Sequence, residues 1–568
     1  MADRVAEIRA ALRRDPGLAL LVIALVAAAA LYLPTIGYGL TNYDDPWLVR
    51  DNVVVRDATW ANVHTILFDL DSPQRFILSP EYLPVRDLSM MLDYAVWGDS
   101  YGGFHATNVA LYLAAIALWF CALGALGIDR TVAGVAVLLW ALHPTHAESV
   151  SWLAERKGLL AAVFAAAAVL GYARWRRGGR GARWLVLAAA CAVLAVWSKA
   201  PAAFAIATIA PLELVLPRVA GEASRRRAMI GIAVVGACAA AAFVPVLVLA
   251  ARAQVVGATA EHGRVATALA VHGLYIELAA LARPNAIVYP IETDGPAALE
   301  IAVGAIALAV VLATLAVRRV PVAVRAGAII WLVCWLPVSH LVLPLQMVVA
   351  ADRYALFTTL GGSLAVAGAL FAIRDRRGRA GLIAAIAVAS GLRALDARAS
   401  WQSDAALWAR ATESAPRDAA AWSEYADAVD DPELAMQITD DGIAHVDSPK
   451  LWLRKALVLQ TTGHAADARP WFQRAAEAGE PVAMADLASL LLDAGDAAGA
   501  LAWGTAAVAA APNTAHAHRT LGRAALATGD RERARRELER AVELEPRNPL
   551  NGELLRGVSV SAGSAIDH

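Results

Sequence analysis

Two adjacent carboxylates, Asp44 and Asp45, follow the first long apolar segment of the chain and precede a proline. A solvated turn is the simplest interpretation of such a pair. A carboxylate pair at a membrane surface could also act as a general base or hold a divalent cation. The pair is therefore a candidate catalytic site, and it is also the candidate cation site if the protein uses a divalent cation.

A second group of polar residues fills residues 143–157, which hold two histidines, two glutamates, an arginine and a lysine. The candidate zinc ligands are His143, His146 and Glu148. Pro144 disturbs the helical spacing of these side chains, and no HExxH motif is present. A phosphate suits Arg156 and Lys157 better, because arginine forms paired charge-assisted hydrogen bonds and lysine supplies a point charge. The alternative is a pair of side chains that extend to the membrane interface.

Further ionisable residues stand at the ends of later apolar segments, at Lys199 and in the sequence Asp352-Arg353-Tyr354. A charge inside a membrane span costs about 2.5–3.5 kcal/mol, so such residues are candidates for function. Asp352 and Arg353 could also simply pair with neighbours. If all these residues share one membrane face, acids that activate a nucleophile lie beside cations that hold a phosphate. That combination suits group transfer from a lipid-linked phosphate donor.

The composition indicates a membrane protein. The 568 residues are 59% hydrophobic and 18% charged, with a mean hydropathy of +0.51, whereas soluble domains are about 45–50% apolar and about 25% charged. A net charge of −1 argues against nucleic acid as the main partner. All four cysteines lie in apolar runs, so neither a disulfide framework nor a metal-binding CxxC motif is predicted.

The apolar runs predict about eleven membrane crossings. They lie at 17–33, 106–127, 131–148, 158–174, 184–199, 202–217, 229–250, 297–317, 326–345, 354–373 and 379–395. Several connecting loops are rich in arginine and are therefore predicted to be cytoplasmic, as is the N-terminus with Arg4, Arg9, Arg13 and Arg14. The remaining loops, at 39–105, 143–157, 251–296 and 346–353, then face outside with the C-terminal region. An apolar face within 87–97 predicts a short helix lying on the membrane lipids.

A repeat of 34 residues occupies the C-terminal part of the chain. Leu487, Ala488, Gly495, Ala500, Gly504, Ala507 and Pro512 align with Leu521, Gly522, Gly529, Ala534, Leu538, Ala541 and Pro546. This is the tetratricopeptide period, and about four copies are predicted. The predicted organisation is a transmembrane domain at 1–395, a linker or helix at 396–414, a tetratricopeptide solenoid at 415–550 and a tail at 551–568. The predicted fold class is all-α.

The order of motifs resembles that of a known family. It runs through Asn42-Tyr43-Asp44-Asp45, Tyr82-Leu83-Pro84-Val85, Phe104-His105, His143-Pro144, Glu148-Ser149-Val150, Glu155-Arg156-Lys157, Ser198-Lys199, Leu336-Pro337-Val338-Ser339-His340 and Ala351-Asp352-Arg353-Tyr354, and then into the repeats. This chain resembles the transmembrane and tetratricopeptide-repeat O-mannosyltransferase-like proteins of the GT-C glycosyltransferase class, in a bacterial-type version.

The resemblance implies an inverting transfer of mannose or another hexose from a polyprenyl-phosphate donor to Ser or Thr hydroxyls of proteins on the non-cytoplasmic face. It places the catalytic base on Asp44 or Asp45, with Asp45 favoured, and gives Glu148 the orientation of the acceptor or sugar. The implied phosphate-binding residues are Arg156, Lys157, Arg353 and Lys199, with Arg86 a replacement for an arginine that the family often carries where Leu83 stands here. His105, His143, His146, Asp352 and Tyr354 complete the implied site.

Two alternative functions remain open from the sequence. The transferase could act on an envelope glycan or lipid, although a repeat array that presents an acceptor polypeptide favours protein. The chain could instead be a membrane scaffold, which would not need acids and cations converging on one face. Arginine far outnumbers lysine, which hints at a bacterial inner membrane with the active site and the repeats on the periplasmic side.

Overall fold

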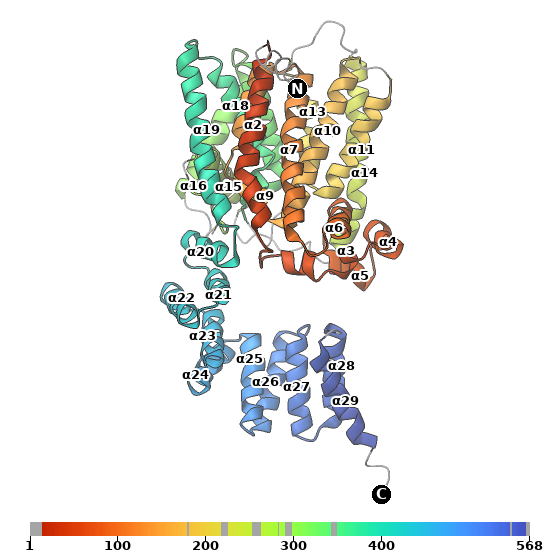
Figure 1. The fold of residues 1–568 in the computed structure, drawn as a ribbon, viewed down its shortest axis with the longest axis vertical. Helices are drawn as coiled ribbons and strands as arrows, with labels where there is room; N and C mark the ends of the chain where they lie inside the picture. Colours follow the sequence, from red (N-terminus) through yellow and green to blue (C-terminus); the bar gives the residue numbers. More distant parts are fainter. Residues whose placement is uncertain are drawn as a thin grey trace, which may run out of the picture. The chain divides into compact units, whose positions relative to one another are not determined.

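A computed structural model of the chain describes residues 14–178, 181–216, 225–252, 263–281, 283–289, 298–341, 349–545 and 548–563. Every regular element in these ranges is a helix, and the chain divides into two compact units, Met1–Leu407 and Trp408–His568 (Figure 1). The division falls inside the predicted segment 396–414. Predicted residues outside the described ranges are Arg4, Arg9, Arg13 and Pro546, together with parts of the segments 202–217, 251–296, 297–317, 326–345, 346–353 and 551–568.

The first unit is a bundle of apolar helices. Its principal helices are α2 (Pro16–Tyr32), α7 (Tyr101–Leu126), α8 (Arg130–Ala141), α10 (Arg156–Arg176), α11 (Arg183–Ser198), α12 (Ala202–Ala207), α13 (Ile209–Leu212), α14 (Arg225–Arg252), α16 (Ala298–Ala316), α17 (Val322–Trp335), α18 (Thr358–Leu370) and α19 (Arg376–Ala399). Among the described residues, six helical segments are long and apolar enough to cross a membrane. Each predicted apolar run contains a helix, as expected for a multi-pass membrane protein. The number of crossings stays a prediction.

One predicted loop contains a buried helix. Residues 251–296 were expected to form a connection outside the membrane, but α15 (Arg264–Ala279) lies there and packs against α16. The buried His272 joins three helices, because its Nδ1 lies 3.1 Å from the Gly304 carbonyl and its Nε2 accepts a hydrogen bond from the Trp331 indole, also at 3.1 Å. The apolar runs of the sequence did not reveal this helix, because such polar side chains interrupt the run, while in the folded chain their partners are inside the bundle. The outer location of the segment stays a prediction.

The arginine-rich connection between α10 and α11, predicted to be cytoplasmic, lies at the end of the bundle where α2 begins. There Arg130 pairs with Asp15 at 2.6 Å, and Arg177 donates to the Gly124 carbonyl at 3.2 Å. The short helices of the predicted first outer loop lie at the opposite end (Figure 1). They are α3 (Val53–Arg56), α4 (Trp60–Phe68), α5 (Pro73–Leu78) and α6 (Pro84–Trp97). The acidic pair therefore lies at the end of the bundle remote from the arginine-rich loops.

Helix α6 buries its charges and exposes its apolar residues. Arg86, Asp87 and Asp93 are at most 5% exposed, whereas Leu92 is 64% and Val96 60% exposed. A water-soluble helix has the opposite arrangement. The exposed apolar face is the one expected of a helix that lies on lipid, as the sequence predicted for residues 87–97.

The second unit is a stack of helix pairs. The pairs are α21 (Ala419–Asp427) with α22 (Pro432–His445), α23 (Pro449–Thr461) with α24 (Ala465–Glu477), α25 (Pro481–Asp493) with α26 (Ala497–Ala510), and α27 (Ala515–Ala527) with α28 (Arg531–Leu544); α20 (Asp404–Ser414) precedes them and α29 (Pro549–Gly563) follows. Gly495 and Gly529 turn the chain within their pairs at φ of +86° and +87°, which glycine adopts without strain. The predicted tetratricopeptide repeats are confirmed.

Candidate active site

The two neighbouring aspartates of the first outer loop have different surroundings. Asp45 is fully buried, and both of its carboxylate oxygens accept backbone hydrogen bonds, from the Thr41 amide at 3.1 Å and from the Ala154 amide at 2.9 Å. Burial raises the pKa of Asp45 to about 7, against the opposing effect of these two bonds. Asp45 thus fastens the start of the loop to the short helix η3 (Leu153–Glu155). The sequence favoured Asp45 over Asp44 as the catalytic base, and the geometry of Asp45 does not support this choice.

Asp44 is half-buried and lies beside cations. Burial raises the pKa of its carboxyl group, while Lys157, a hydrogen bond from the Trp47 side chain, and Arg353 lower it. The Tyr43 ring on one side of it packs edge-on against Trp152, with ring centroids 5.1 Å apart. Asp44 is therefore the carboxylate of the pair that a substrate can reach.

Arg156 is not available for a phosphate. It is fully buried and donates to the Asn108 side-chain oxygen at 2.8 Å and to the Phe104 carbonyl at 2.7 Å, and it pairs with Asp93 at 2.5 Å. These contacts use its Nε and both terminal nitrogens within the protein. The sequence prediction that Arg156 holds the donor phosphate is corrected: the residue joins α10 to α6 and α7.

The guanidinium of Arg86 also bonds to groups within the protein. It is 2% exposed, donates to Asp87 at 2.8 Å through Nε and to the Leu78 carbonyl at 3.1 Å, and its ion pair with Asp87 is 2.6 Å long. Its guanidinium contributes positive potential near Asp44, since it lowers the pKa of that carboxyl group. The sequence suggested that Arg86 replaces the arginine that the family often carries where Leu83 stands here. Arg86 is poorly placed to bind the phosphate directly, however, because its guanidinium is bound within the protein.

Three other cations surround the candidate site, each paired with a carboxylate. Lys157 pairs with the exposed Glu81 at 2.7 Å, Lys199 pairs with the buried Glu155, and Arg353 pairs with Glu148. Arg353 also donates its backbone amide to Glu148 at 2.7 Å. Glu148 therefore fixes both the backbone and the side chain of Arg353. The structure thus brings Lys157, Lys199 and Arg353 together around one end of the bundle.

The segment that carries Arg353 is held by its neighbour. Asp352 accepts hydrogen bonds from the Asn285 side chain at 2.7 Å and from the Tyr289 hydroxyl at 2.5 Å. Burial, reinforced by the nearby Glu148 charge, raises the pKa of Asp352 to about 7. Tyr354 lies between two cations, with the Arg353 Cζ atom 5.0 Å and the Lys199 Nζ atom 5.7 Å from its ring centre. Asp352 positions the helix η5 (Asp352–Ala355), and Tyr354 lines the site.

The three predicted histidines serve as internal hydrogen-bonding groups. His105 Nε2 lies 3.2 Å from the Gly39 carbonyl, and His143 Nδ1 lies 2.8 Å from the Thr145 hydroxyl. His146 contacts the Tyr112 hydroxyl at 2.7 Å through Nδ1 and the Thr359 hydroxyl at 2.9 Å through Nε2. Within the part of the chain that the structure describes, no group of three or more His, Cys, Asp or Glu side chains is arranged to hold a metal ion. The zinc interpretation is therefore not supported by the geometry of these residues.

The role of His146 can be tested by substitution. We expect His146→Phe to lower the stability of the protein by about 1–3 kcal/mol, because the buried Tyr112 and Thr359 hydroxyls lose a partner. Thermal unfolding of the detergent-purified protein would measure this effect. The metal content of the variant, measured by elemental analysis, should equal that of the wild type. A selective loss of zinc would show that His146 is a ligand instead.

Several residues of the site carry no distinctive sequence signal. Asn285 and Tyr289 lie in a segment predicted as a plain loop, and Trp401, whose ring stacks on Trp152 at 5.6 Å, stands in the predicted linker. Their contacts depend on residues more than sixty positions away. Glu81 was detectable as the acid that precedes the Tyr82-Leu83-Pro84 motif.

Comparison with known proteins agrees with this description. A family model described as a tetratricopeptide repeat matches residues 491–550. Protein O-mannosyl-transferase Tmtc3 of Drosophila melanogaster is 30% identical over 171 residues, which are 26% of this chain and 18% of that protein. Protein O-mannosyl-transferase TMTC1 of Mus musculus is 31% identical over 140 residues, or 23% and 14% of the two chains. The matches thus span less than a fifth of the relatives' own length.

Among solved structures, the archaeal oligosaccharyltransferase AglB from Archaeoglobus fulgidus, in complex with an inhibitory peptide and a dolichol-phosphate, aligns with a TM-score of 0.41 and 14% identity. The alignment covers 74% of this chain and 59% of that one. The class is defined by this chain's own helices: an all-α membrane protein with a tetratricopeptide unit. About a quarter of the chain is similar to these protein O-mannosyl-transferases, in agreement with the resemblance predicted from the order of its motifs.

Proposed function

We propose that this protein is an integral-membrane glycosyltransferase that moves mannose or another hexose from a polyprenyl-phosphate donor to Ser or Thr hydroxyls of proteins, with inversion. The names of its relatives support glycosyl transfer. The observation that carries the proposal is the position of Asp44, a half-buried carboxylate within the electrostatic reach of Lys157 and Arg353. An acid beside two cations is the set of groups that this reaction requires.

In the proposed reaction Asp44 acts as the general base. The acceptor hydroxyl attacks the anomeric carbon, and its oxygen forms the new glycosidic bond as the bond from that carbon to the donor phosphate oxygen breaks. The hydroxyl proton passes to the Asp44 carboxylate, and the electron pair leaves with the polyprenyl phosphate. Attack from the side opposite the leaving group inverts the anomeric carbon.

The cations stabilise the departing phosphate. Arg353, held by Glu148, presents a fixed guanidinium, and Lys157 and Lys199, held by Glu81 and Glu155, add two ammonium groups. Negative charge grows on the phosphate oxygen as the bond breaks, so preorganised cations lower the barrier. The rings of Tyr43 and Tyr354 lie in this region and are partly exposed, so a sugar can stack on them.

The acceptor is proposed to be a polypeptide. Tetratricopeptide stacks usually bind peptides or proteins, and the described part of the second unit is a stack of such helix pairs. The Asp44 end of the bundle is proposed to face the non-cytoplasmic side, the periplasm of a bacterial inner membrane, because the positive-inside rule assigns the arginine-rich loops to the cytoplasm. Of the two adjacent aspartates, Asp44 is the one that a divalent cation could reach, because both carboxylate oxygens of Asp45 accept backbone hydrogen bonds.

Whole-envelope glycoproteomics tests the proposal. Cells that express the wild type are compared with cells that express Asp44→Asn at an equal protein level. We expect hexose-modified Ser and Thr peptides in the first and their loss in the second. Unchanged glycopeptides with altered envelope glycans or lipids would instead establish a different acceptor. If the glycopeptides, glycans and lipids are all unchanged, the chain is a membrane scaffold and the proposal is wrong.

A further inference from the structure

The last long helix of the first unit ends beside the loop that carries Asp44. This helix, α19, packs against α2 and α8 and leads into the segment 398–404. Three side chains of this segment, spaced three residues apart, contact the end of α2 or the candidate site. They are Arg398, Trp401 and Asp404.

Asp404 holds the backbone two residues before Asp44. Its Oδ1 atom accepts a hydrogen bond from the Asn42 amide at 2.6 Å. The amide of the preceding residue, Thr41, donates to Asp45 at 3.1 Å, so two successive amides of the loop are bound by two different aspartates. A contact between residues 362 positions apart therefore fixes the path of the loop next to Asp44.

Trp401 supports the same loop through an aromatic contact. It is 3% exposed, and its ring stacks on Trp152 with the centroids 5.6 Å apart and an angle of 20° between the planes. Trp152 also contacts the Tyr43 ring at 5.1 Å and the Arg353 Cζ atom at 5.4 Å from its ring centre. Trp401 thus supports the ring that touches both the neighbour of Asp44 and a cation of the site.

The segment 398–404 is itself fixed at both ends. The Arg398 guanidinium donates to the Leu31 carbonyl at 2.6 Å, where α2 ends and the chain continues toward the acidic loop. The Ser403 hydroxyl accepts a hydrogen bond from the Ala406 amide at 3.2 Å and so begins α20. The first unit extends beyond this segment, so the two contacts with the loop lie within one compact unit.

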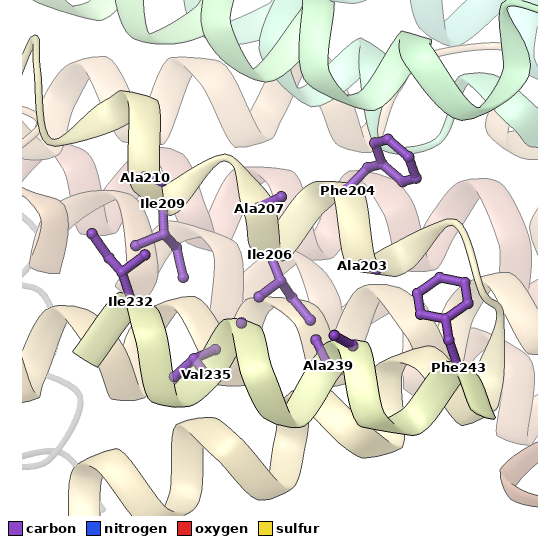
Figure 2. Close-up of a pocket in the computed structure, with 12 residues that line it drawn as sticks. Ala203, Phe204, Ile206, Ala207, Ile209, Ala210, Ile232, Val235, Ala239 and Phe243 are labelled. Atoms are coloured by element: carbon purple, nitrogen blue, oxygen red, sulfur yellow. The ribbon is translucent and has the colours of Figure 1, made fainter. Parts of the chain in front are cut away.

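The apolar cavity between α12–α13 and α14 takes no part in this positioning. It encloses about 390 Å³, and Figure 2 shows its lining of aliphatic and phenylalanine side chains. None of the lining residues belongs to the loop at Asp44 or to the segment 398–404, and none carries a polar side chain. The position of Asp44 depends instead on direct contacts between its loop and the neighbouring segments.

We propose that the segment 398–404 positions the general base. Asp404 and Trp401 keep the loop 41–45 where the Asp44 carboxylate can take the proton of the acceptor hydroxyl. This proposal rests on the proposed function, since it assigns positioning residues to the proposed transfer. Both residues act through the loop and through Trp152, and a misplacement of a reacting group by about 1 Å costs about 10²-fold in rate.

Sugar transfer by the purified full-length protein tests the role of Asp404. We expect Asp404→Ala to lower kcat by about 10–100-fold and to leave KM for the donor within about twofold, because the cations for the phosphate are unchanged. The melting temperature should change little, since the hydrogen bond to Asn42 is exposed to water. Asp404→Asn keeps an oxygen that accepts this bond and should recover most of kcat.

Asp431→Ala is the matched control. Asp431 is an exposed aspartate of the second unit, and its carboxylate accepts a backbone amide, that of Glu433, at 3.0 Å. This variant should keep the kcat of the wild type. An unchanged kcat in Asp404→Ala, or a loss that Asp404→Asn does not recover, would overturn the proposal while an active wild type left the proposed transfer in place.

Two substitutions of Trp401 test the aromatic contact. Trp401→Phe keeps a ring against Trp152 and should stay close to the wild type. Trp401→Leu removes the ring, and we expect kcat of the folded protein, isolated by size-exclusion chromatography, to fall by about tenfold. The same kcat in the two variants would contradict a positioning role for the Trp401 ring.

Hydrogen exchange gives a readout that needs no sugar donor. Amides in a peptide that covers 38–48 should exchange faster in Asp404→Ala than in the wild type, because the Asn42 amide loses its acceptor. Asp404→Asn should restore the protection, and unchanged exchange in Asp404→Ala would overturn the proposal. A wild type that transfers no sugar would overturn the proposed function, and exchange would still decide whether Asp404 holds the loop.

Discussion

Replacing Asp44 with asparagine should lower the rate of sugar transfer by about 10²–10⁴-fold, the range expected when a general base is removed. The stability of the protein should change little, because Asp44 is half-buried and its carboxylate does not fasten the loop backbone. The measurement is transfer from a synthetic polyprenyl-phosphate hexose to an acceptor peptide by the purified protein. Binding of the donor should survive, since the cations that hold its phosphate are intact.

Asp45→Asn provides the contrast. Its amide can accept one of the two backbone hydrogen bonds, but its NH₂ group faces the second donor, from Thr41 or Ala154. We therefore expect a loss of about 1–3 kcal/mol in stability, seen as a lower melting temperature, and a loss of activity that follows the loss of folded protein. An inactive Asp45→Asn protein of normal stability, with an active Asp44→Asn, would reverse the assignment of the base.

The pH dependence of transfer is a second test of Asp44 as the general base. A general base works when deprotonated, so activity falls as pH drops through its pKa. Burial raises the pKa of Asp44 above its ordinary value, which moves this loss of activity to higher pH than for a free aspartate. The acid limb should be absent from the residual activity of Asp44→Asn.

The elements of the fold follow from local sequence properties. Runs of about 20 apolar residues predict the long helices because no other structure satisfies the backbone in lipid. The 34-residue period predicts the helix pairs because small residues such as Gly522, whose added Cβ would lie 2.7 Å from Leu538, must recur wherever two helices meet closely. Helix α15 was missed because its polar side chains find their partners only after folding.

The candidate site follows from sequence only in part. Ionisable residues next to apolar runs lie together at one end of the bundle, as the cost of a charge in lipid leads one to expect. The roles of adjacent residues could not be separated in this way. Arg156 and Lys157 are neighbours, yet successive side chains on a helix point about 100° apart, so Arg156 is buried in the bundle and Lys157 reaches Glu81. Which face of α10 is buried depends on how α6 and α7 pack against it, and the sequence of α10 alone does not show this.

Arg156→Met should be the most destabilising single substitution at this end of the bundle. The guanidinium is buried and pairs with Asp93, and it also bonds to Asn108 and the Phe104 carbonyl. Methionine fills similar space but leaves the Asp93 carboxylate without its cation. Breaking a buried pair by removing one partner costs about 3–5 kcal/mol, which is a large share of a typical folding free energy. The expected result is a strongly lowered melting temperature in detergent and reduced membrane expression.

Lys157→Met is the matched control, because it removes a positive charge from the next residue of the same helix. Its partner Glu81 is about half exposed, so water replaces the lost contact and stability should change by less than about 1 kcal/mol. Donor binding should weaken instead, since Lys157 is among the cations proposed to hold the phosphate. An Arg156→Met protein that is stable but fails to bind donor would show that Arg156 belongs to the phosphate site. A double variant, Arg156→Met with Asp93→Asn, should recover stability, because it no longer contains an uncompensated charge. This recovery would confirm the structural role of Arg156.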